Sequence, residues 1–386
     1  MSLIHRSPAP LALTALTALA LSACGTLEPQ RPAPVTRIEV PPEPVAEVRS
    51  EPVLQRLAPQ TLALPVNPAP NSYAHRDDAR LLAQRLAERY QLDAQWASSV
   101  LAQAQVNDTV ARLIMPAASP TAKNWAAYRS RFVEPIRIRA GAAFWRLNED
   151  TLRRAEQRYG VPVDIIVGVI GVETIYGRQT GNFRILDALA TLSLDFPKGR
   201  SDRSAFFQDE LGQFLRLCAE QGDDPSSYLG SYAGAIGWPQ FMPSSIRRFA
   251  VDFDGDGHID LRNSVADAIG SVAHFLQRHG WVTGQPTHFA VTPPDDEAQR
   301  QTLLGPDILP SFTAAEFAQR GAQLDEPGRA HSGPLALVQL FNGEQPPSYV
   351  AGTRNFYVIT RYNQSSYYAL AVIELGQAVA DAVKKS

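Results

Sequence analysis

Cysteine is scarce in this chain, which has 2 cysteines among 386 residues. Two thiols cannot form a disulfide framework, so the fold depends on its hydrophobic residues, which make up 45% of the chain. An excess of positive charge is also missing, because the formal net charge is -3 at pH 7. The sequence contains neither an internal repeat nor a heptad pattern. The composition therefore gives no electrostatic reason to expect a nucleic-acid partner.

A long hydrophobic run is missing too, and the nearest candidate lies close to the N-terminus. Arg6 precedes an apolar segment, residues 11–21, that is too short to cross a bilayer comfortably. A short apolar segment after a basic residue is typical of a secretory signal peptide. It ends in Leu-Ser-Ala-Cys, residues 21–24, which resembles the lipobox of bacterial lipoproteins. This resemblance implies a signal peptide over residues 1–23 and a lipid on Cys24.

Two kinds of signal fit the residues around Cys24. The alternative to a lipoprotein signal is a plain secretory signal with an incidental cysteine, because the small residues Ser22, Ala23 and Gly25 suit either. We favour the lipoprotein, since Cys24 lies where signal cleavage is expected. Resemblance to Gram-negative lipoproteins that lack aspartate after the cysteine implies anchorage at the periplasmic face of the outer membrane. Cys218 would then be the only free thiol.

Aromatic residues are absent from residues 25–70, which hold 11 of the 30 prolines. Such a stretch cannot bury a core and should run as an extended, semi-rigid spacer. In polyproline II geometry, at about 3.1 Å per residue, it could reach on the order of 140 Å. We therefore interpret residues 24–70 as a tether that lets a globular body work far from its lipid.

The globular body begins near Ser72, and its length predicts two or more subdomains. Apolar residues at helical spacing predict most of its elements. The expected helices are 77–92, 93–106, 143–160, 161–177, 184–196, 204–221, 264–281 and 367–385. After Trp281 the helical periodicity fades and short segments between turn signals predict strands instead. The expected strands are 287–291, 334–341 and 355–362.

An acidic loop, Asp-Phe-Asp-Gly-Asp-Gly-His-Ile-Asp-Leu-Arg-Asn, occupies residues 252–263. Its aspartates at positions 1, 3, 5 and 9 and a glycine at position 6 match the EF-hand calcium loop up to the last position. The first three of these acids are Asp252, Asp254 and Asp256, and His258 would contribute its backbone carbonyl. A solvated acidic turn is the alternative interpretation.

The last position of this loop departs from the EF-hand pattern. Position 12 is Asn263 where a bidentate glutamate belongs, so Asp267 is the nearest acid that could close the site. We expect the metal to be structural Ca²⁺, because the loop contains no catalytic group. An organic cofactor is not expected.

Glu173 is the main candidate for chemistry. It ends the apolar run Val-Pro-Val-Asp-Ile-Ile-Val-Gly-Val-Ile-Gly-Val, residues 161–172. A carboxyl buried among such residues has a raised pKa, which suits a general acid that cleaves sugars. The alternative is a structural ion pair with Arg178 or Arg184, since structural pairs also place carboxylates in apolar surroundings.

Several long segments together resemble the membrane-bound lytic murein transglycosylases of type B. They are residues 160–177, 184–197, 230–261, 267–281 and 359–372, in that order. The resemblance implies a mainly α fold of the α+β class, with a lysozyme-like core that carries the EF-hand-type loop. The domains so implied are a helical domain over 71–145 completed by 366–386, a catalytic core over 146–281, and a small β domain over 282–365.

The resemblance also implies an activity on peptidoglycan. This activity cleaves the β-1,4 bond between N-acetylmuramic acid and N-acetylglucosamine without hydrolysis and leaves 1,6-anhydromuramyl ends. Glu173 matches the single catalytic acid and base. The residues that match the saccharide groove are Tyr128, Ser231, Gln240, Tyr362, Asn363 and Tyr368. The implied partners are peptidoglycan glycan strands and, through the lipid, the outer membrane.

One stretch departs from the family pattern, namely residues 196–207, which are longer than expected after the Asp-Phe-Pro segment. Arg203 is the preferred substrate-contacting residue there, with Lys198 and Arg200 as alternatives. Phe206 stands where the family has a tyrosine.

Two other functions stay open at the level of sequence. A hydrolytic muramidase would need a second carboxylate, for which Asp187 and Asp195 are the nearest acids. A non-catalytic lipoprotein that binds the cell wall would equally use the tether and the calcium loop.

Overall fold

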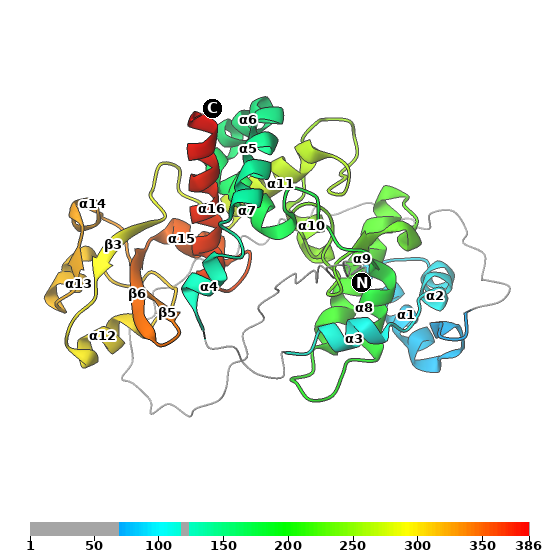
Figure 1. The fold of residues 1–386 in the computed structure, drawn as a ribbon. Coiled ribbons are helices and arrows are strands. Elements are labelled where there is room, and N and C mark those ends of the chain that lie inside the picture. The colour runs from blue at the N-terminus through cyan, green and yellow to red at the C-terminus, as the bar shows by residue number, and fades with distance from the viewer. Residues whose placement is uncertain (1–68, 117–122, 386) are drawn as a thin grey trace, which may run out of the picture.

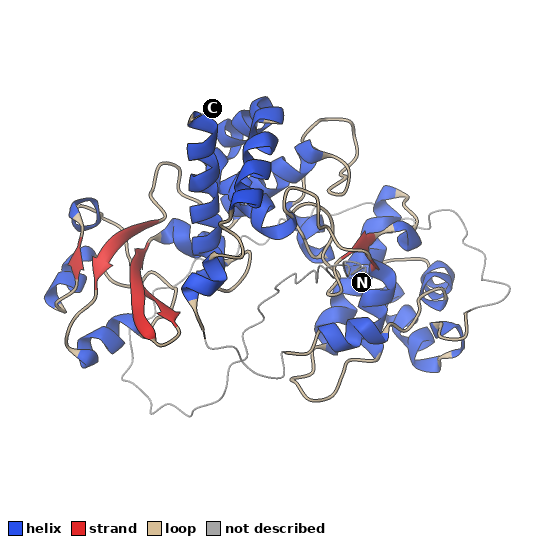
Figure 2. Cartoon of the chain, in the orientation of Figure 1, coloured by secondary structure: helices blue, strands red, loops and turns tan. Residues whose placement is uncertain are grey.

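The computed structural model describes residues 69–116 and 123–385. Within these ranges the chain is mainly helical, and the strands form two small sheets that Figure 2 shows in red. No helix in the described part is long and apolar enough to span a membrane. The proposed signal peptide, Cys24 and the tether up to residue 68 lie outside the described residues and stay predictions.

The first helices pack against the middle of the chain. Helix α1 contacts both α2 and α9, and α3 contacts α8, so these elements form one helical layer on the right of Figure 1. Their bounds are η1 Tyr73–His75, α1 Asp77–Tyr90, α2 Ala94–Ala102, α3 Asp108–Leu113, α8 Ile185–Leu194 and α9 Ser204–Gln221. Leu82, Leu86, Phe207, Leu211 and Phe214 are buried here. The helical spacing of apolar residues in these segments therefore did mark their buried faces.

A second helical group contains the most apolar helix and the last helix of the chain. The bounds are α4 Trp125–Arg129, α5 Pro135–Leu147, α6 Glu149–Tyr159, α7 Val163–Thr174 and α16 Ser366–Lys384. Helix α16 lies antiparallel to α7, since Gly168 faces Val372 and Gly376 faces Asp164. A Cβ at Gly168 or Gly376 would clash with the backbone of the other helix. These glycines therefore allow the two helices to approach closely.

Between these groups the chain forms a loop-rich connection and two further helices. The bounds are β1 Phe183–Arg184, η2 Pro225–Ser227, β2 Leu229–Gly230, α10 Pro243–Phe249 and α11 Val265–Arg278. Strands β1 and β2 pair antiparallel. Helix α11 contacts α6 and α7, and α10 contacts α9 and α11. The acidic loop connects α10 to α11, so it joins the two helical groups.

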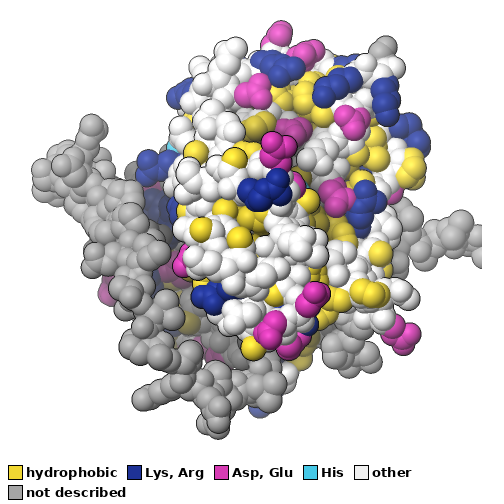
Figure 3. Space-filling view, turned by 90° about the vertical axis from the view of Figure 1, so that its left-hand side faces the viewer, with side chains coloured by type: hydrophobic (Ala, Val, Ile, Leu, Met, Phe, Trp, Pro, Cys, Tyr) yellow, Lys and Arg dark blue, Asp and Glu magenta, His cyan; other side chains and the backbone are white. Residues whose placement is uncertain are grey.

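The small β subdomain has a hydrophobic core of its own. Its four-stranded antiparallel sheet has the order β4-β3-β6-β5. The bounds are β3 His288–Thr292, α12 Glu297–Leu304, α13 Ala314–Gln319, β4 Gln323–Leu324, α14 Glu326–Arg329, β5 Ala336–Asn342, β6 Gln345–Gly352 and α15 Arg354–Thr360. Phe289, Leu303, Phe317 and Leu337 form its core. Figure 3 views the molecule from this side, where charged side chains of both signs lie between hydrophobic ones.

Two expected elements differ in the structure. The expected strand 355–362 is wrong: this run forms α15, whose N-cap Thr353 accepts a hydrogen bond from Asn355 N, and Phe356, Val358 and Ile359 are buried on it. Strand β6 was not expected, because prolines are unfavourable in most strands. The expected helix 143–160 is two helices, because Asn148 takes non-helical angles and its amide donates to the Phe144 carbonyl.

The C-terminal helix, α16, was expected to complete a helical domain over residues 71–145. Helix α16 packs on α4, α5 and α7, while α1 packs on α2 and α9. Of the helices in the expected domain over residues 71–145, α16 thus packs mainly on α4 and α5. The reason is that α7, the most apolar helix, must be covered on several sides, and α16 supplies one of them. The domain boundaries themselves stay a prediction.

Candidate active site

Glu173 lies in the last turn of α7, whose other residues are nearly all buried. Its own side chain is half-buried. The helix ends one residue later, at Thr174, because Ile175 adopts a left-handed conformation with φ of 51° and Tyr176 follows with φ of 55°. A β-branched residue in this region is unfavourable and needs surrounding structure to hold it. The backbone is therefore strained directly beside the candidate catalytic carboxyl.

Among the residues that the structure describes, the side chain that hydrogen-bonds to the carboxyl group of Glu173 is Tyr368. Its hydroxyl donates to Glu173 Oε1 at 2.6 Å. Burial raises the pKa of Glu173 to about 7, and the hydrogen bond from Tyr368 opposes part of that rise. Such a carboxyl is about half protonated at neutral pH. It can therefore both give and take a proton, as acid–base catalysis requires.

The alternative role of Glu173 as a structural ion pair does not hold among the described residues. Arg184 instead pairs with Asp187 at 2.6 Å and donates to the Gln103 carbonyl. Arg178 is exposed and forms no ion pair with Glu173 in the described part of the chain. The raised pKa of Glu173 thus reflects burial without a compensating cation.

Tyrosines form a wall beside Glu173. Tyr362 donates to the Pro239 carbonyl at 2.6 Å, and its ring stacks on Tyr368 with centroids 6.1 Å apart. Burial, reinforced by the charge of Glu173, raises the pKa of Tyr128 to about 12. Three of the expected groove residues, Tyr128, Tyr362 and Tyr368, are thus brought to Glu173 although they come from both ends of the chain.

Two other expected groove residues help to shape the loop between β2 and α10. Gln240, with φ of 51°, donates from Nε2 to the Thr180 and Gly237 carbonyls at 3.0 and 2.9 Å. Ser231 is buried, and its Oγ accepts from Ala235 N at 3.0 Å. Both side chains therefore fix the backbone of this loop, and contact with substrate stays a prediction for each.

The remaining expected substrate residues have other surroundings. The guanidinium of Arg203 lies over the ring of Phe206 at 4.5 Å from its centroid, at the start of α9. Phe206 is 39% exposed. Asn363 is half-buried, and its backbone carbonyl accepts from Ser365 N at 2.6 Å. No hydrogen bond or ring contact among the described residues joins these three side chains to Glu173.

The sequence did not point to Thr174, whose hydroxyl links the end of α7 to a neighbouring loop. Its buried hydroxyl donates to the Trp238 carbonyl at 3.0 Å and accepts from Gly177 N at 3.1 Å. It thereby ties the end of α7 to the loop that carries Gln240. A threonine beside the candidate acid was visible in the sequence, but the loop it reaches lies 64 residues away.

The two acids considered as second carboxylates are engaged elsewhere. Asp187 accepts from Gln105 N at 2.8 Å in addition to its pair with Arg184. Asp195 accepts from Tyr73 at 2.5 Å and from Arg76 at 2.7 Å. Both aspartates thus attach α8 to the first helices.

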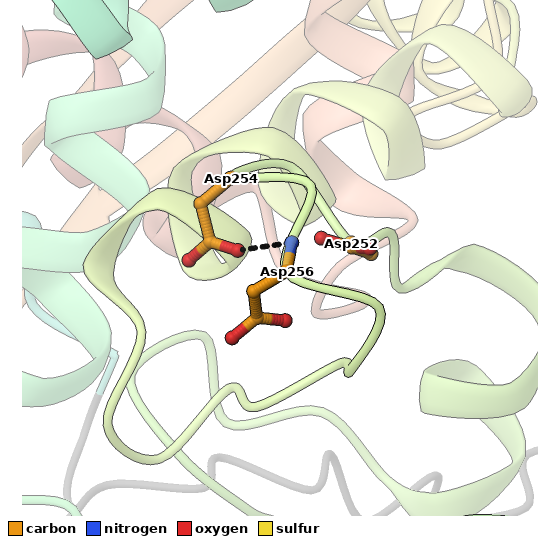
Figure 4. Close-up of side chains that lie close together, drawn as sticks. All are labelled: Asp252, Asp254 and Asp256. Atoms are coloured by element: carbon orange, nitrogen blue, oxygen red, sulfur yellow. Dashed lines mark hydrogen bonds between the residues drawn. The ribbon is translucent and has the colours of Figure 1, made fainter.

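The acidic loop gathers three carboxylates at one place. One oxygen from each of Asp252, Asp254 and Asp256 lies within 4.8 Å of the others. Figure 4 shows the three side chains, with Asp254 accepting from Asp256 N at 3.3 Å. The backbone N–H of Gly257 holds the pKa of Asp252 below its usual range. Within the described residues none of the three is in an ion pair, so the cluster suits a hard cation such as Ca²⁺.

The structure does not bring Asp267 into this cluster, contrary to expectation. Asp267 is fully buried, and its two oxygens accept from Phe253 N at 2.7 Å and from Asp260 N at 2.8 Å. The carboxylate therefore supports both ends of the loop from inside. The backbone N–H of His258 donates to Asp256 Oδ1 at 2.8 Å, and the His258 ring is not part of the carboxylate cluster.

A carboxyl with a raised pKa at the end of a buried helix, faced by tyrosines in a mainly helical fold, is the arrangement expected of a lysozyme-like enzyme that cleaves glycosidic bonds. The chain belongs to the transglycosylase SLT family, whose domain model matches residues 75–377. It is a peptidoglycan lytic transglycosylase, which confirms the class expected from the sequence.

Known proteins resemble the chain over most of its length. It is 40% identical over 322 residues to membrane-bound lytic murein transglycosylase B of Escherichia coli strain K12. The aligned region covers 80% of this chain and 84% of that protein. A structure of the catenated lytic transglycosylase SltB1 from Pseudomonas aeruginosa is 39% identical, with a TM-score of 0.73, and covers 81% of this chain and all of the other.

A third similarity concerns metal binding. The Escherichia coli lytic transglycosylase Slt35 in complex with calcium is 39% identical, with a TM-score of 0.69, and covers 81% of this chain and 95% of the other. The mainly helical fold class is thus shared with solved lytic transglycosylases.

Proposed function

We propose that this enzyme cleaves the β-1,4 bond between N-acetylmuramic acid and N-acetylglucosamine without water, and that Glu173 serves first as acid and then as base. The observation that carries the proposal is the carboxyl of Glu173, whose pKa is raised to about 7 and whose side-chain partner is a tyrosine rather than a cation. A retaining or inverting hydrolase needs a second carboxylate at the scissile bond. Asp187 and Asp195 are committed to ion pairs instead.

In the first step, protonated Glu173 gives its proton to the glycosidic oxygen. The C1–O bond breaks, its electron pair stays with the departing N-acetylglucosamine, and positive charge develops on the muramic acid ring. The hydroxyl of Tyr368 then stabilises the carboxylate that Glu173 has become, because it already donates to Oε1 at 2.6 Å.

In the second step, the Glu173 carboxylate takes the proton of the C6 hydroxyl of the same muramic acid. The O6 atom forms a bond to C1 and closes the 1,6-anhydro ring, and Glu173 is protonated again. The nucleophile belongs to the substrate, so its effective concentration is already high. Mass spectrometry of products from purified sacculi tests the proposal: anhydro ends support it, and reducing ends, heavier by one water, would show hydrolysis. No cleavage at all would favour a non-catalytic wall-binding role.

The groove around Glu173 would hold the saccharide. Tyr128, Tyr362 and Tyr368 already lie at the carboxyl, and aromatic faces suit sugar rings. Ser231, Gln240, Asn363, Arg203 and Phe206 are proposed to extend the groove on both sides. Substitution of each to alanine, followed by measurement of KM on glycan strands, tests their part.

We further propose that the acidic loop binds structural Ca²⁺ through Asp252, Asp254, Asp256 and the carbonyl of His258. The three clustered carboxylates without a cationic partner support this, and so does the calcium complex of the similar Slt35. Bound calcium would neutralise the cluster and stiffen the connection between α10 and α11. No hydrogen bond or ion pair among the described residues joins the loop to the Glu173 carboxyl, so the ion is proposed to have no step in the reaction.

Membrane attachment is proposed to occur through a lipid on Cys24, with the enzyme at the periplasmic face of the outer membrane. Support comes from the Leu-Ser-Ala-Cys segment and from similarity to a protein named as membrane-bound. Fractionation of cells that express Cys24→Ala tests the proposal: the variant should leave the membrane fraction, and unchanged membrane attachment would refute it.

A further inference from the structure

We propose that a cavity between the start of α7, the middle of α16 and strand β3 binds an N-acetylated hexosamine unit of the cell-wall glycan, in addition to the unit that reacts at Glu173. This inference rests on the proposed action on peptidoglycan and adds a second glycan site to it. The cavity has a volume of about 450 Å³, and its lining includes Asp164, Trp281, His288 and Gln377. Its size lies in the range of pockets that hold small ligands.

The cavity lies at the opposite end of the helix pair that carries the candidate active site. Asp164 is in the first turn of α7 and Glu173 in its last, so the two residues are about 14 Å apart along the helix axis. Because the helices run antiparallel, Gln377 of α16 lines the cavity while Tyr368 of the same helix bonds to Glu173. In Figure 1 the cavity lies between α16 and β3. None of the residues expected in the saccharide groove is among the described residues that line it.

The indole N–H of Trp281 is a buried donor without an acceptor. Trp281 is 8% exposed, and its Nε1 atom has no hydrogen-bond partner among the residues that the structure describes. Most buried polar groups are paired, because an unpaired donor is unfavourable. A ligand oxygen that accepts from this N–H would therefore be favoured, and the carbonyl of an acetamido group is such an acceptor.

Polar side chains in the same lining match the hydroxyl groups of a sugar. The Asp164 carboxylate accepts from Ile165 N at 3.0 Å, and no ion pair joins it to a residue in the described part of the chain. The side-chain amide of Gln377 is on the exposed side of α16 and forms no hydrogen bond within the described ranges. A carboxylate accepts from hydroxyl groups, and an amide both donates and accepts. Asp164 and Gln377 can therefore orient a ring that carries several hydroxyls.

The charges of the lining favour a neutral ligand. No lysine or arginine is among the described residues of the lining, which includes Asp164 and Asp325, so an anion would be repelled. Burial raises the pKa of Asp164 and lowers the pKa of the His288 ring, so both groups favour their neutral forms. Asp325 is engaged as the N-cap of α14, where it accepts from Gly328 N at 2.8 Å. A simple ammonium ion would leave the N–H of Trp281 without an acceptor.

Apolar side chains complete the walls of the cavity. Ile165 and Ile373 come from the two helices, Phe289 from β3 and Pro286 from the turn before it. A few polar groups between apolar walls are typical of sites that bind small ligands. The C–H face of a pyranose ring and the methyl of its acetamido group suit these walls. The lining comes from the helical pair and from the β subdomain, so a bound glycan would connect both to the sacculus between cleavage events.

Fluorine NMR of protein labelled with 5-fluorotryptophan tests the site, because the chain has 5 tryptophans and Trp281→Phe identifies the resonance of Trp281. Titration with chitotriose, a soluble trimer of N-acetylglucosamine without peptide, should shift this resonance. Asp164→Asn and Gln377→Ala should each raise the Kd so measured about fivefold, the usual effect of one lost hydrogen bond. Trp145 is the matched control, since it is 7% exposed on α5 and does not line the cavity, and its resonance should stay in place.

Sedimentation with purified sacculi measures the consequence for the wall. In a Glu173→Gln background, which leaves the sacculi intact, Trp281→Phe should weaken binding to sacculi about fivefold, again the effect of one hydrogen bond, and Trp145→Phe should not. Thermal melts verify that each variant is folded. Gln377→Ala replaces Trp281→Phe if the latter is not, because Gln377 is exposed.

Three results would overturn the second glycan site. The Trp281 resonance may not move at saturating chitotriose, or its Kd may be unchanged in both Asp164→Asn and Gln377→Ala. A shift with cadaverine, a diamine, but not with chitotriose would assign the cavity to an organic cation instead. Each of these results leaves the proposed cleavage in place. Reducing ends in the products of the wild type would overturn that cleavage without changing the binding result.

Discussion

Tyr368 and Glu173 are joined by a 2.6 Å hydrogen bond although 195 residues separate them in the chain. The bond connects the first turn of α16 to the last turn of α7, which run antiparallel. Close packing at Gly168 and Gly376 permits this approach. The hydroxyl donates to the carboxyl, so it favours the ionised form, while burial favours the protonated form. The balance between these two effects sets the pH dependence of both activity and stability.

Glu173→Gln should lower kcat on purified sacculi by at least about 10²–10⁴-fold, because an amide can neither give nor take the proton. Binding of glycan strands should change little, since the shape of the side chain is kept. Release of anhydromuropeptides, followed by mass spectrometry, measures the loss. Asp187→Asn is a suitable comparison because that acid is ion-paired with Arg184. Full activity in Glu173→Gln would refute the assignment.

The pH profile of kcat/KM should fall on the alkaline side with an apparent pKa near 7, since the first step needs protonated Glu173. Tyr368→Phe removes a hydrogen bond that stabilises the carboxylate. The pKa of Glu173 should therefore rise, and the alkaline limb should move to higher pH, while kcat falls. A limb at the same pH in Tyr368→Phe would contradict this role of the hydroxyl.

Stability should depend on pH through the same group. The pKa of Glu173 is about 7 in the folded protein against an ordinary value of 4.5, so the folded state holds the proton more tightly. This contribution is complete below pH 4.5 and is lost as pH rises through 7. Glu173→Gln should therefore gain stability relative to wild type between pH 5 and pH 8.5, by up to about 3 kcal/mol. Urea unfolding at both pH values measures it, and a constant difference would contradict the raised pKa.

Calcium should raise the melting temperature of the wild type relative to excess chelator. A ligand at 100 times its Kd stabilises by about 2.7 kcal/mol. Asp256→Asn should remove the response, because one of three clustered carboxylates is lost. Asp295→Asn, in the turn before α12, serves as a matched control that keeps it. An unchanged wild-type melt in excess calcium would exclude the site.

Thr174→Val should destabilise the protein by about 1–3 kcal/mol, because the partly buried Trp238 carbonyl loses a donor and Gly177 N loses an acceptor. Thr174→Ser keeps the hydroxyl and should stay much closer to wild type. Since Thr174 follows Glu173 directly, Thr174→Val should also lower kcat. Denaturant unfolding compares the two variants, and equal stabilities would show that the hydroxyl bonds contribute little.

Local patterns in the sequence predicted most of the longer helices and the acidic loop. Helical spacing of apolar residues marks buried faces, so α9 was predicted with the bounds it has, and α1, α7 and α11 within a few residues. The pattern failed for residues 355–362, where buried aromatic and β-branched residues form α15 rather than a strand. Periodicity cannot separate a short buried helix from a buried strand. Strand β6 was not predicted, because its prolines are typical of a turn. In the structure they lie where the register of the sheet is irregular.

The features of the candidate site also fall into those that the sequence predicts and those that only the structure decides. The sequence by itself determined that Glu173 ends a buried apolar helix and that three aspartates alternate in a glycine-containing loop, because both facts depend on neighbouring residues. Only the tertiary structure decided which groups meet: Tyr368 rather than an arginine at Glu173, and the backbone of Phe253 and Asp260 rather than the acidic cluster at Asp267. These contacts join segments that local periodicity cannot relate, since they arise from how closely helices pack and where loops cross.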